Sequence, residues 1–267
     1  MKKNIFLLLM ILLNCSFSFS QKPDPDFHIY LLMGQSNMAG RGKITEDLKK
    51  LKHTNVLMLD SNYQWVEAKH PVHFDKPKVA GVGPGLSFGM AMANANPSAK
   101  IGLVPCAVGG TSIGKWTPGA YDKATNTHPY DDAVKRIQEA MKYGVIKGVI
   151  WHQGEANSSG EGSKTYISKL TELIDKVRTL TGNANLPFVA GELGYFKPHY
   201  QNINTVLKEL PQKSANTAVA TSEGLKDKGD ATHFDGPSAD ELGKRFAVKM
   251  IELQSVQKTG NSKKATK

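Results

Sequence analysis

Six short apolar runs, separated by longer segments of helical periodicity, constrain this fold more than any other feature of the chain. Several runs are apolar at almost every position, which is typical of strands buried on both faces. Between them, apolar residues recur at helical spacing, as in Leu242, Phe246 and Met250. This alternation predicts an α/β fold with a mostly parallel sheet between two layers of helices. The expected strands are 28–33, 55–59, 100–106, 147–151, 187–191 and 217–221, and the expected helices are 85–95, 130–143, 163–180, 200–207 and 238–254.

The first twenty residues match a secretory signal peptide. Lys2 and Lys3 precede an apolar run at residues 5–13, and a short polar stretch follows. The run is too short to cross a membrane, which takes about 20 residues. We therefore expect cleavage near Ser20, export to the periplasm or the extracellular space, and no integral membrane segment afterwards. Asn14 disfavours lipid anchoring at Cys15, because a small residue is expected before a lipid-modified cysteine.

The rest of the composition fits one domain, at residues 21–257, followed by a basic tail at 258–267 that we expect to be disordered. The formal net charge of +10 falls to +8 when Lys2 and Lys3 are removed. The remaining lysines are dispersed, so nucleic acid is not an expected partner. Two cysteines exclude a disulfide scaffold and a Cys-rich zinc site. Cys106 lies in an apolar run and is expected to be a buried, inert thiol.

Four blocks of polar residues and glycine punctuate the chain. Three of them follow expected strands, and the fourth precedes the final expected helix. The carboxyl ends of parallel strands lie at one edge of a sheet, so these blocks should gather there. Their residue types (Ser, His, Asp, Glu, Gln, Asn and Gly) are those of a hydrolase with a serine nucleophile. The blocks are Gly-Gln-Ser-Asn-Met-Ala-Gly at 34–40, Ala-Val-Gly-Gly-Thr-Ser-Ile-Gly at 107–114, His-Gln-Gly-Glu-Ala-Asn at 152–157 and Asp-Ala-Thr-His-Phe-Asp at 230–235.

A serine hydroxyl is a weak nucleophile and needs an adjacent base with an orienting acid. Ser36 is the expected nucleophile and His233 the expected base. Asp230, three residues before His233, is one candidate for the acid that orients the imidazole. Glu155, which follows another strand, is the second candidate, and the sequence leaves the two open.

The oxyanion of an acyl-transfer intermediate needs two or three fixed donors. The backbone N–H of Ser36 and that of Gly109 or Gly110 are candidates, because glycine permits close backbone approach. An amide side chain would complete the set, and of Gln153 and Asn157 we favour Gln153.

Two other serines match the pattern G-x-S-x-G, which requires a strand–turn–helix context. Ser112 follows an expected strand, but the sequence Lys-Trp-Thr-Pro-Gly at 115–119 does not readily begin a helix. Ser87 has no convincing strand before it. We therefore favour Ser36 over both. His70 and His73 lie in a Pro-flanked loop without metal-ligand spacing, so no metal site is expected.

Taken together and in this order, the four polar blocks resemble the SGNH hydrolase superfamily. They are most similar to its sialate O-acetylesterase-like and carbohydrate esterase family 6 (acetyl xylan esterase) branch, as is the segment Gly-Val-Gly-Pro-Gly-Leu-Ser-Phe-Gly at 81–89. The resemblance spans about residues 28–253. It implies a flavodoxin-like three-layer α/β/α sandwich and cofactor-free removal of O-acetyl groups from sugars. By motif, it implies that Ser36 is nucleophile and oxyanion donor, His233 the base, Asp230 its partner and Gly109 or Gly110 an oxyanion donor.

Three further residues are expected to contact the sugar: Gln35 and Asn37 beside the nucleophile, and Trp116 as a stacking wall. Packing in the core is an equally good interpretation of Trp116. The predicted function is thus an exported serine esterase acting on an O-acetylated carbohydrate, either a xylan-type polysaccharide or a sialic acid. The alternatives are a catalytically silent carbohydrate-binding protein on the same fold, and a lipase or thioesterase of the wider superfamily. The sequence predicts no oligomeric state.

Overall fold

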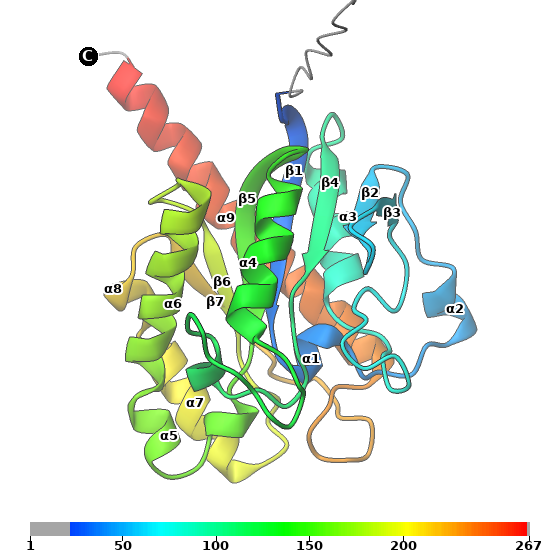
Figure 1. The fold of residues 1–267 in the computed structure, drawn as a ribbon, viewed down its shortest axis with the longest axis vertical. Helices are drawn as coiled ribbons and strands as arrows, with labels where there is room; N and C mark the ends of the chain where they lie inside the picture. The colour runs from blue at the N-terminus through cyan, green and yellow to red at the C-terminus, as the bar shows by residue number, and fades with distance from the viewer. Residues whose placement is uncertain (1–21, 266–267) are drawn as a thin grey trace, which may run out of the picture.

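Seven strands form one sheet in the computed structural model, which describes residues 22–265 and their side chains as far as residue 257. The strand order is β3-β2-β4-β1-β5-β6-β7, and every pairing is parallel except that of β2 with β3 (Figure 1). The mostly parallel sheet is therefore confirmed. The strands are β1 (Asp24–Gly34), β2 (Val56–Leu59), β3 (Trp65–Glu67), β4 (Lys100–Pro105), β5 (Gly144–His152), β6 (Phe188–Gly191) and β7 (Thr217–Ala220).

All six expected strands are present, and β3 is the one that the sequence did not predict. It has three residues and pairs antiparallel with β2 at the edge of the sheet. Such a short segment carries too few positions for an alternating pattern to be recognised. Its Trp65 packs edge-on against Phe27, with ring centroids 4.7 Å apart. This edge strand is therefore associated with the tertiary packing of one aromatic side chain, which a local sequence pattern does not reveal.

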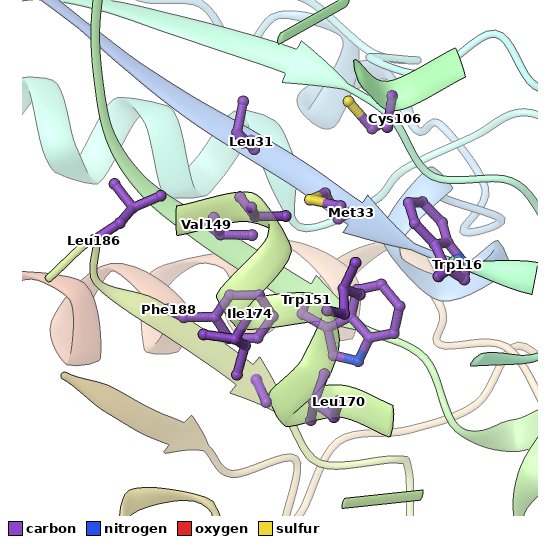
Figure 2. Packing of buried hydrophobic residues seen from close by; sticks show 14 of the residues in the cluster. Leu31, Met33, Cys106, Trp116, Val149, Trp151, Leu170, Ile174, Leu186 and Phe188 are labelled. Atoms are coloured by element: carbon purple, nitrogen blue, oxygen red, sulfur yellow. The ribbon is translucent and has the colours of Figure 1, made fainter. Parts of the chain in front are cut away.

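Helices cover both faces of the sheet, and β1 shows how its residues divide between them. Ile29, Leu31 and Met33 pack in the core shared with α4 (Pro129–Ala140) and α6 (Tyr166–Thr181) (Figure 2). Tyr30 and Leu32 point the opposite way, into the core shared with α3 (Gly85–Ala95) and α9 (Gly236–Ala265). Successive side chains of a strand alternate between faces, so an unbroken apolar run fills both cores. The three-layer arrangement is therefore confirmed.

Each of the five expected helices is present. The fifth begins at Gly236 in α9 and continues to Ala265, whereas the sequence predicted a disordered tail from residue 258. Once a helix has begun, each added residue gains one hydrogen bond, which favours continuation of the helix into this segment. The shorter helices are α1 (Ser36–Ala39), α2 (Glu46–Lys49), α5 (Glu161–Lys164), α7 (Gln201–Leu207) and α8 (Leu210–Lys213).

The predicted signal peptide at residues 1–20 lies outside the described residues. Among the helices of residues 22–265, none combines the length and the apolar character that crossing a bilayer requires.

The position of β1 fixes where a site can form. From β1 the chain crosses to β2, returns to β4 beside β1, and then moves to β5 on the other side of β1. The connection after β1 therefore runs toward β2, whereas the connection after its neighbour β5 runs the opposite way, toward β6, and a crevice forms at such a switch point. Three of the four polar blocks begin there, after β1, β4 and β5.

Candidate active site

Ser36 is held at the carboxyl end of the central strand. Gly34 ends β1 with a φ of +132°, and a Cβ on it would lie 2.1 Å from the backbone oxygen of His152. Only glycine permits both this dihedral and this approach. The Gln35 N–H then donates to the same His152 oxygen (2.9 Å), and Ser36 begins α1 with 7% of its surface exposed. The sheet itself therefore positions the hydroxyl.

Ser36, His233 and Asp230 form one hydrogen-bonded chain. The Nε2 atom of His233 lies 3.0 Å from the Ser36 Oγ, and its Nδ1 atom lies 2.7 Å from the Asp230 Oδ2. A carboxylate only accepts, so Nδ1 donates its proton to Asp230 and the neutral ring presents the Nε2 lone pair to Ser36. In Figure 1 the orange segment that leads into α9 lies at the same edge of the sheet as α1. This is the geometry by which a histidine activates a serine.

Asp230 is kept ionised by its own loop. Burial acts to raise its pKa, but hydrogen bonds from the His233 side chain and from the backbone N–H groups of His233 and Thr232 outweigh burial and leave the pKa well below its usual range. The ammonium group of Lys228 also lies 3.4 Å from the Asp230 Oδ2. A negative charge therefore stands behind the imidazole throughout the neutral pH range.

Asn37 fastens the His233 loop to the nucleophile. Its Nδ2 donates to the Thr232 oxygen (3.0 Å), and its Oδ1 accepts from the Phe234 N–H (3.1 Å). These two backbone groups flank His233 on either side. Asn37 was expected to contact the sugar, but it is 3% exposed and offers little surface for such a contact. Its polar atoms are used inside the protein, and what they fix is the position of the base.

Glu155 lies behind Asn37 and does not reach His233. Its Oε1 accepts from the Asn37 Nδ2 at 2.5 Å, its side chain is 5% exposed, and its Oε2 has no partner among the described residues. The Oε1 atom is also 3.7 Å from the Nδ1 of His152. Asp230 is therefore the acid that contacts the base, and Glu155 acts on the site through Asn37.

Both amide side chains after β5 have a fixed orientation. The Asn157 Oδ1 accepts from the Ile113 N–H (2.9 Å) and from the Gln153 Nε2 (2.8 Å). The Gln153 Nε2 is also within hydrogen-bond distance of the Gln35 Oε1 and the Thr111 oxygen. Three acceptors thus surround two hydrogens, and Gln153 has none left for an oxyanion. The preference for Gln153 is corrected: the amide without an acceptor among the described residues is the Nδ2 of Asn157.

Two residues that the sequence analysis missed lie beside the glycines after β4. Asp75 Oδ2 accepts from the Gly109 N–H (2.8 Å) and from Arg41 Nη2 (2.6 Å). Burial acts to raise the Asp75 pKa, but the hydrogen bond and charge of Arg41 lower it overall. The Gly109 N–H is thereby engaged. The Gly110 N–H has no acceptor within the described part of the chain.

Gly109 nevertheless lies against the nucleophile, because a Cβ on it would be 3.4 Å from the Ser36 Cβ. The only sequence signal for the buried Arg41–Asp75 pair was the position of Arg41, directly after the first polar block. Asp75 stands in an irregular loop, and nothing in its neighbours' sequence relates it to β4.

The other two residues that were expected to contact the sugar are buried as well. Trp116 is 1% exposed and packs edge-on against Trp151, with ring centroids 5.2 Å apart, so no sugar reaches it (Figure 2). Gln35 is buried and bonded to Gln153. An apolar indole in a core of this kind is stabilised by burial and by its aromatic neighbour, which explains why the packing interpretation holds.

Neither alternative serine is placed for catalysis. Ser87 lies inside α3, buried, and its hydroxyl donates to the Asp240 oxygen (2.7 Å). Ser112 precedes a short 3-10 helix, Ile113–Lys115, and forms no hydrogen bond with a histidine of the described part of the chain. Cys106 is buried as expected, and burial raises the pKa of its thiol to about 12.

Comparison with known proteins gives one consistent family. The model of the family described as carbohydrate esterase, sialic acid-specific acetylesterase, matches residues 26–252. A probable carbohydrate esterase of Arabidopsis thaliana is 32% identical over 246 residues, which are 85% of this chain and 91% of the plant protein. The crystal structure of the Arabidopsis protein is similar with a TM-score of 0.75 at 31% identity, covering 85% of this chain and 99% of that chain.

Two more distant structures share the fold. The crystal structure of NanS has a TM-score of 0.69 at 16% identity, over 86% of this chain and 98% of that chain. A carbohydrate acetylesterase from Xanthomonas citri has a TM-score of 0.64 at 19% identity, over 83% of this chain and 55% of that chain. The chain is thus an SGNH-type carbohydrate esterase and belongs to the sialic acid-specific acetylesterase family.

Proposed function

We propose that this carbohydrate acetylesterase works through an acetyl-serine intermediate on Ser36 and releases acetate from an O-acetylated sugar outside the cytoplasm. One observation carries the mechanism: the unbroken chain from Ser36 Oγ through His233 to Asp230, with distances of 3.0 and 2.7 Å. The family membership carries the substrate class.

In the first half-reaction, the Ser36 Oγ attacks the acetyl carbonyl while the Nε2 of His233 takes the hydroxyl proton. The same proton then passes to the departing sugar oxygen, and the acetyl group stays on Ser36. In the second half-reaction, His233 deprotonates a water molecule, which attacks the acetyl-serine and frees acetate. Asp230 holds the ring in the required tautomer and stabilises its cationic form.

The oxyanion in both steps needs donors that have no other acceptor. Three donors of the polar blocks meet this condition among the described residues: the N–H of Ser36, the N–H of Gly110 and the Nδ2 of Asn157. We assign the oxyanion hole to these three. Gly109 and Gln153 contribute by fixing the loop and the amide, respectively, because their own donors are engaged.

The test compares the parent protein with Ser36→Ala and Ser112→Ala, using acetate release from an aryl acetate and from acetylated sugars. Ser36→Ala should reduce kcat by at least about 10³-fold, because the nucleophile is lost. Ser112→Ala removes the same atom from a serine after β4 and should keep its kcat. Mass spectrometry of a rapidly quenched reaction should show one acetyl group on the peptide that contains Ser36. Retained activity in Ser36→Ala would contradict the proposal.

Export rests on the sequence of residues 1–20 alone. Expression of the full chain in a bacterial host should give a mature protein that begins near Gln21 and fractionates outside the cytoplasm. A lipid-modified Cys15 at the N-terminus would instead indicate a membrane-anchored enzyme. An uncleaved cytoplasmic product would overturn this part of the proposal.

A further inference from the structure

A buried ion pair lies beside the proposed nucleophile and takes no part in the proton transfer. The Nη2 atom of Arg41 is 2.6 Å from the Oδ2 atom of Asp75, and the two side chains are only 6% and 3% exposed. Removing two charges from water costs nearly as much as their attraction returns, so a buried pair of this kind adds little stability. What it does provide is a fixed geometry, and its contacts show which groups it fixes.

The pair joins the segment of the proposed nucleophile to the glycine loop after β4. On one side, the Nη1 of Arg41 donates to the backbone oxygen of Gly40, which caps the C-terminal end of α1 (2.7 Å). On the other side, the Asp75 Oδ2 accepts the Gly109 N–H (2.8 Å) as well as the guanidinium. Asp75 therefore fixes the backbone from which the N–H of Gly110 projects.

The vacant Cβ position of Gly109 marks where these groups meet. A Cβ there would lie 2.4 Å from the Nη2 of Arg41, 3.0 Å from the Oδ2 of Asp75 and 3.4 Å from the Cβ of Ser36. Both charges and the proposed nucleophile therefore surround one point, in the space that a single methyl group would fill. A side chain at residue 109 would displace Arg41, so glycine is required for the pair to lie this close to Ser36.

The position of the pair matters for the negative charge that develops on the acetyl oxygen during attack. A carboxylate alone at this distance would oppose the oxyanion, because two negative charges repel strongly in the interior of a protein. Burial acts to raise the pKa of Asp75, but the hydrogen bond and the charge of Arg41 outweigh it. Both side chains are therefore ionised and their charges cancel. No lysine or second arginine of the described residues forms an ion pair with Asp75, so this compensation depends on Arg41.

We propose that Arg41 and Asp75 are positioning residues for the oxyanion hole. Asp75 fixes the backbone of Gly109 and Gly110, while Arg41 ties Asp75 to the segment that carries Ser36 and cancels its negative charge. The inference rests on the proposed function, because it concerns the oxyanion that forms when Ser36 attacks. A pair with a purely structural role would change the stability of the protein and leave the turnover of the folded enzyme unchanged.

The experiment compares Arg41→Met, Asp75→Asn and the double variant Arg41→Met/Asp75→Asn with the parent. Arg178→Met is the matched control: Arg178 is also buried, at 8% exposed, but it donates to the backbone oxygens of Leu186 and Ala215, before β6 and β7. Three quantities are measured: kcat and KM on an aryl acetate, the urea midpoint, and the affinity for phenylboronic acid. This acid adds to a serine hydroxyl as a tetrahedral anion, so its affinity reports how well the site stabilises an oxyanion.

Arg41→Met should lower kcat by about 10²-fold or more, because it leaves an uncompensated carboxylate beside the oxyanion. Asp75→Asn should lower kcat by only about tenfold, because its amide oxygen still accepts the Gly109 N–H and no negative charge remains. The double variant should therefore turn over faster than Arg41→Met, although it lacks both native side chains. KM should change little, and the affinity for phenylboronic acid should fall in proportion to kcat. Arg178→Met should lower the urea midpoint and keep both kcat and this affinity.

Arg41→Lys retains the positive charge and should keep kcat within about tenfold of the parent. It also keeps the proposal testable if Arg41→Met does not fold, since parent-like kcat in both Arg41→Lys and Asp75→Asn would then overturn it. Parent-like kcat in a folded Arg41→Met, or a double variant slower than Arg41→Met, would overturn it as well. All these outcomes leave the Ser36-dependent release of acetate intact, whereas failure of the proposed function would appear as activity that survives Ser36→Ala.

Discussion

The proposed nucleophile, Ser36, and its proposed base, His233, are held by different kinds of structure. Ser36 follows the central strand, where parallel pairing on both sides and the contact of Gly34 with His152 leave no freedom. His233 lies in a loop without regular secondary structure. It donates its backbone N–H to Asp230, and Asn37 holds the backbone of its two neighbours, Thr232 and Phe234. The position of Ser36 therefore depends on the sheet as a whole, and changing it would disrupt the fold. The position of His233 depends on a few polar contacts, which substitutions can remove one at a time.

The largest expected effect is a loss of stability on substitution of Gly34, at the end of β1. Gly34→Ala places a methyl group against the backbone of His152, which cannot yield, at a φ that alanine rarely adopts. We expect the free energy of unfolding to fall by at least about 3 kcal/mol, measured by urea denaturation. Gly229→Ala is the matched change in the loop that carries His233. Gly229 has a φ of +103°, and no atom lies within 4 Å of the new Cβ. It should cost less, and equal losses would contradict the comparison.

The second-largest effect is expected from Asp230, the acid in the loop that carries His233. Asp230→Asn should lower kcat by about 10²–10⁴-fold, because a neutral amide neither fixes the tautomer of His233 nor stabilises its cation. The fold should remain, since the residue is partly exposed. Steady-state kinetics on an aryl acetate, together with circular dichroism, tests this. Activity within tenfold of the parent would instead return the orienting role to Glu155.

Asp230 also has a pH signature. Its folded-state pKa lies below the unfolded value of about 3.9, so its charge adds stability that is fully present above about pH 5. That stability is lost as the pH falls through the folded pKa. The difference in urea midpoint between the parent and Asp230→Asn should therefore be largest near neutrality and shrink in acid. Lys228 and His233 are the charged or titratable groups that face this carboxylate.

A smaller effect is expected from Asn37→Ala, which removes the two hydrogen bonds to the backbone on either side of His233. We expect kcat to fall by about 10–100-fold, because the Nε2 of His233 loses its fixed distance from Ser36. Asn204→Ala is the matched control: Asn204 is equally buried and bonds both backbone groups of Leu193, away from His233. Both variants should lose stability by about 1–3 kcal/mol. Only Asn37→Ala should lose turnover, and equal kcat values would show that Asn37 is merely structural.

The smallest effect belongs to Lys228. Its ammonium group is 3.4 Å from Asp230, but both side chains are more than a third exposed, where ion pairs contribute little. Lys228→Ala should change kcat by less than about twofold. A larger loss at low salt that disappears at high salt would show that the charge of Lys228 supports the acid directly.

Periodicity predicted most of this fold because it reports burial. The unbroken run of β1 and the stripe of Leu242, Phe246 and Met250 each follow from the faces that they cover. The first polar block indicated Ser36 because residues that follow parallel strands gather at one edge, whereas Asp230 and His233, which precede the last helix, were indicated by their residue types and their spacing of three. These inferences need only the order of elements along the chain.

What the sequence did not predict depends on which donor meets which acceptor. Gln153 and Asn157 both carry a side-chain amide, so the sequence does not distinguish them as oxyanion donors. Only the N–H of Ile113 and the acceptors around Gln153 distinguish their roles. Trp116 was ambiguous because an indole that packs in a core and one that stacks on a sugar occupy similar sequences. Asp75 reaches Gly109 from an irregular loop, where sequence spacing carries no information about contact.

The span between Ser36 and His233, 197 residues, has a consequence for the timing of assembly. β1 is made first but pairs only with strands that follow much later, and α9, which closes the core over it, is made last. Contacts so distant along the chain form slowly. A nascent polypeptide that still lacks residues 230–265 therefore has the proposed nucleophile without the proposed base, and we expect acetate release only once this segment has joined the core.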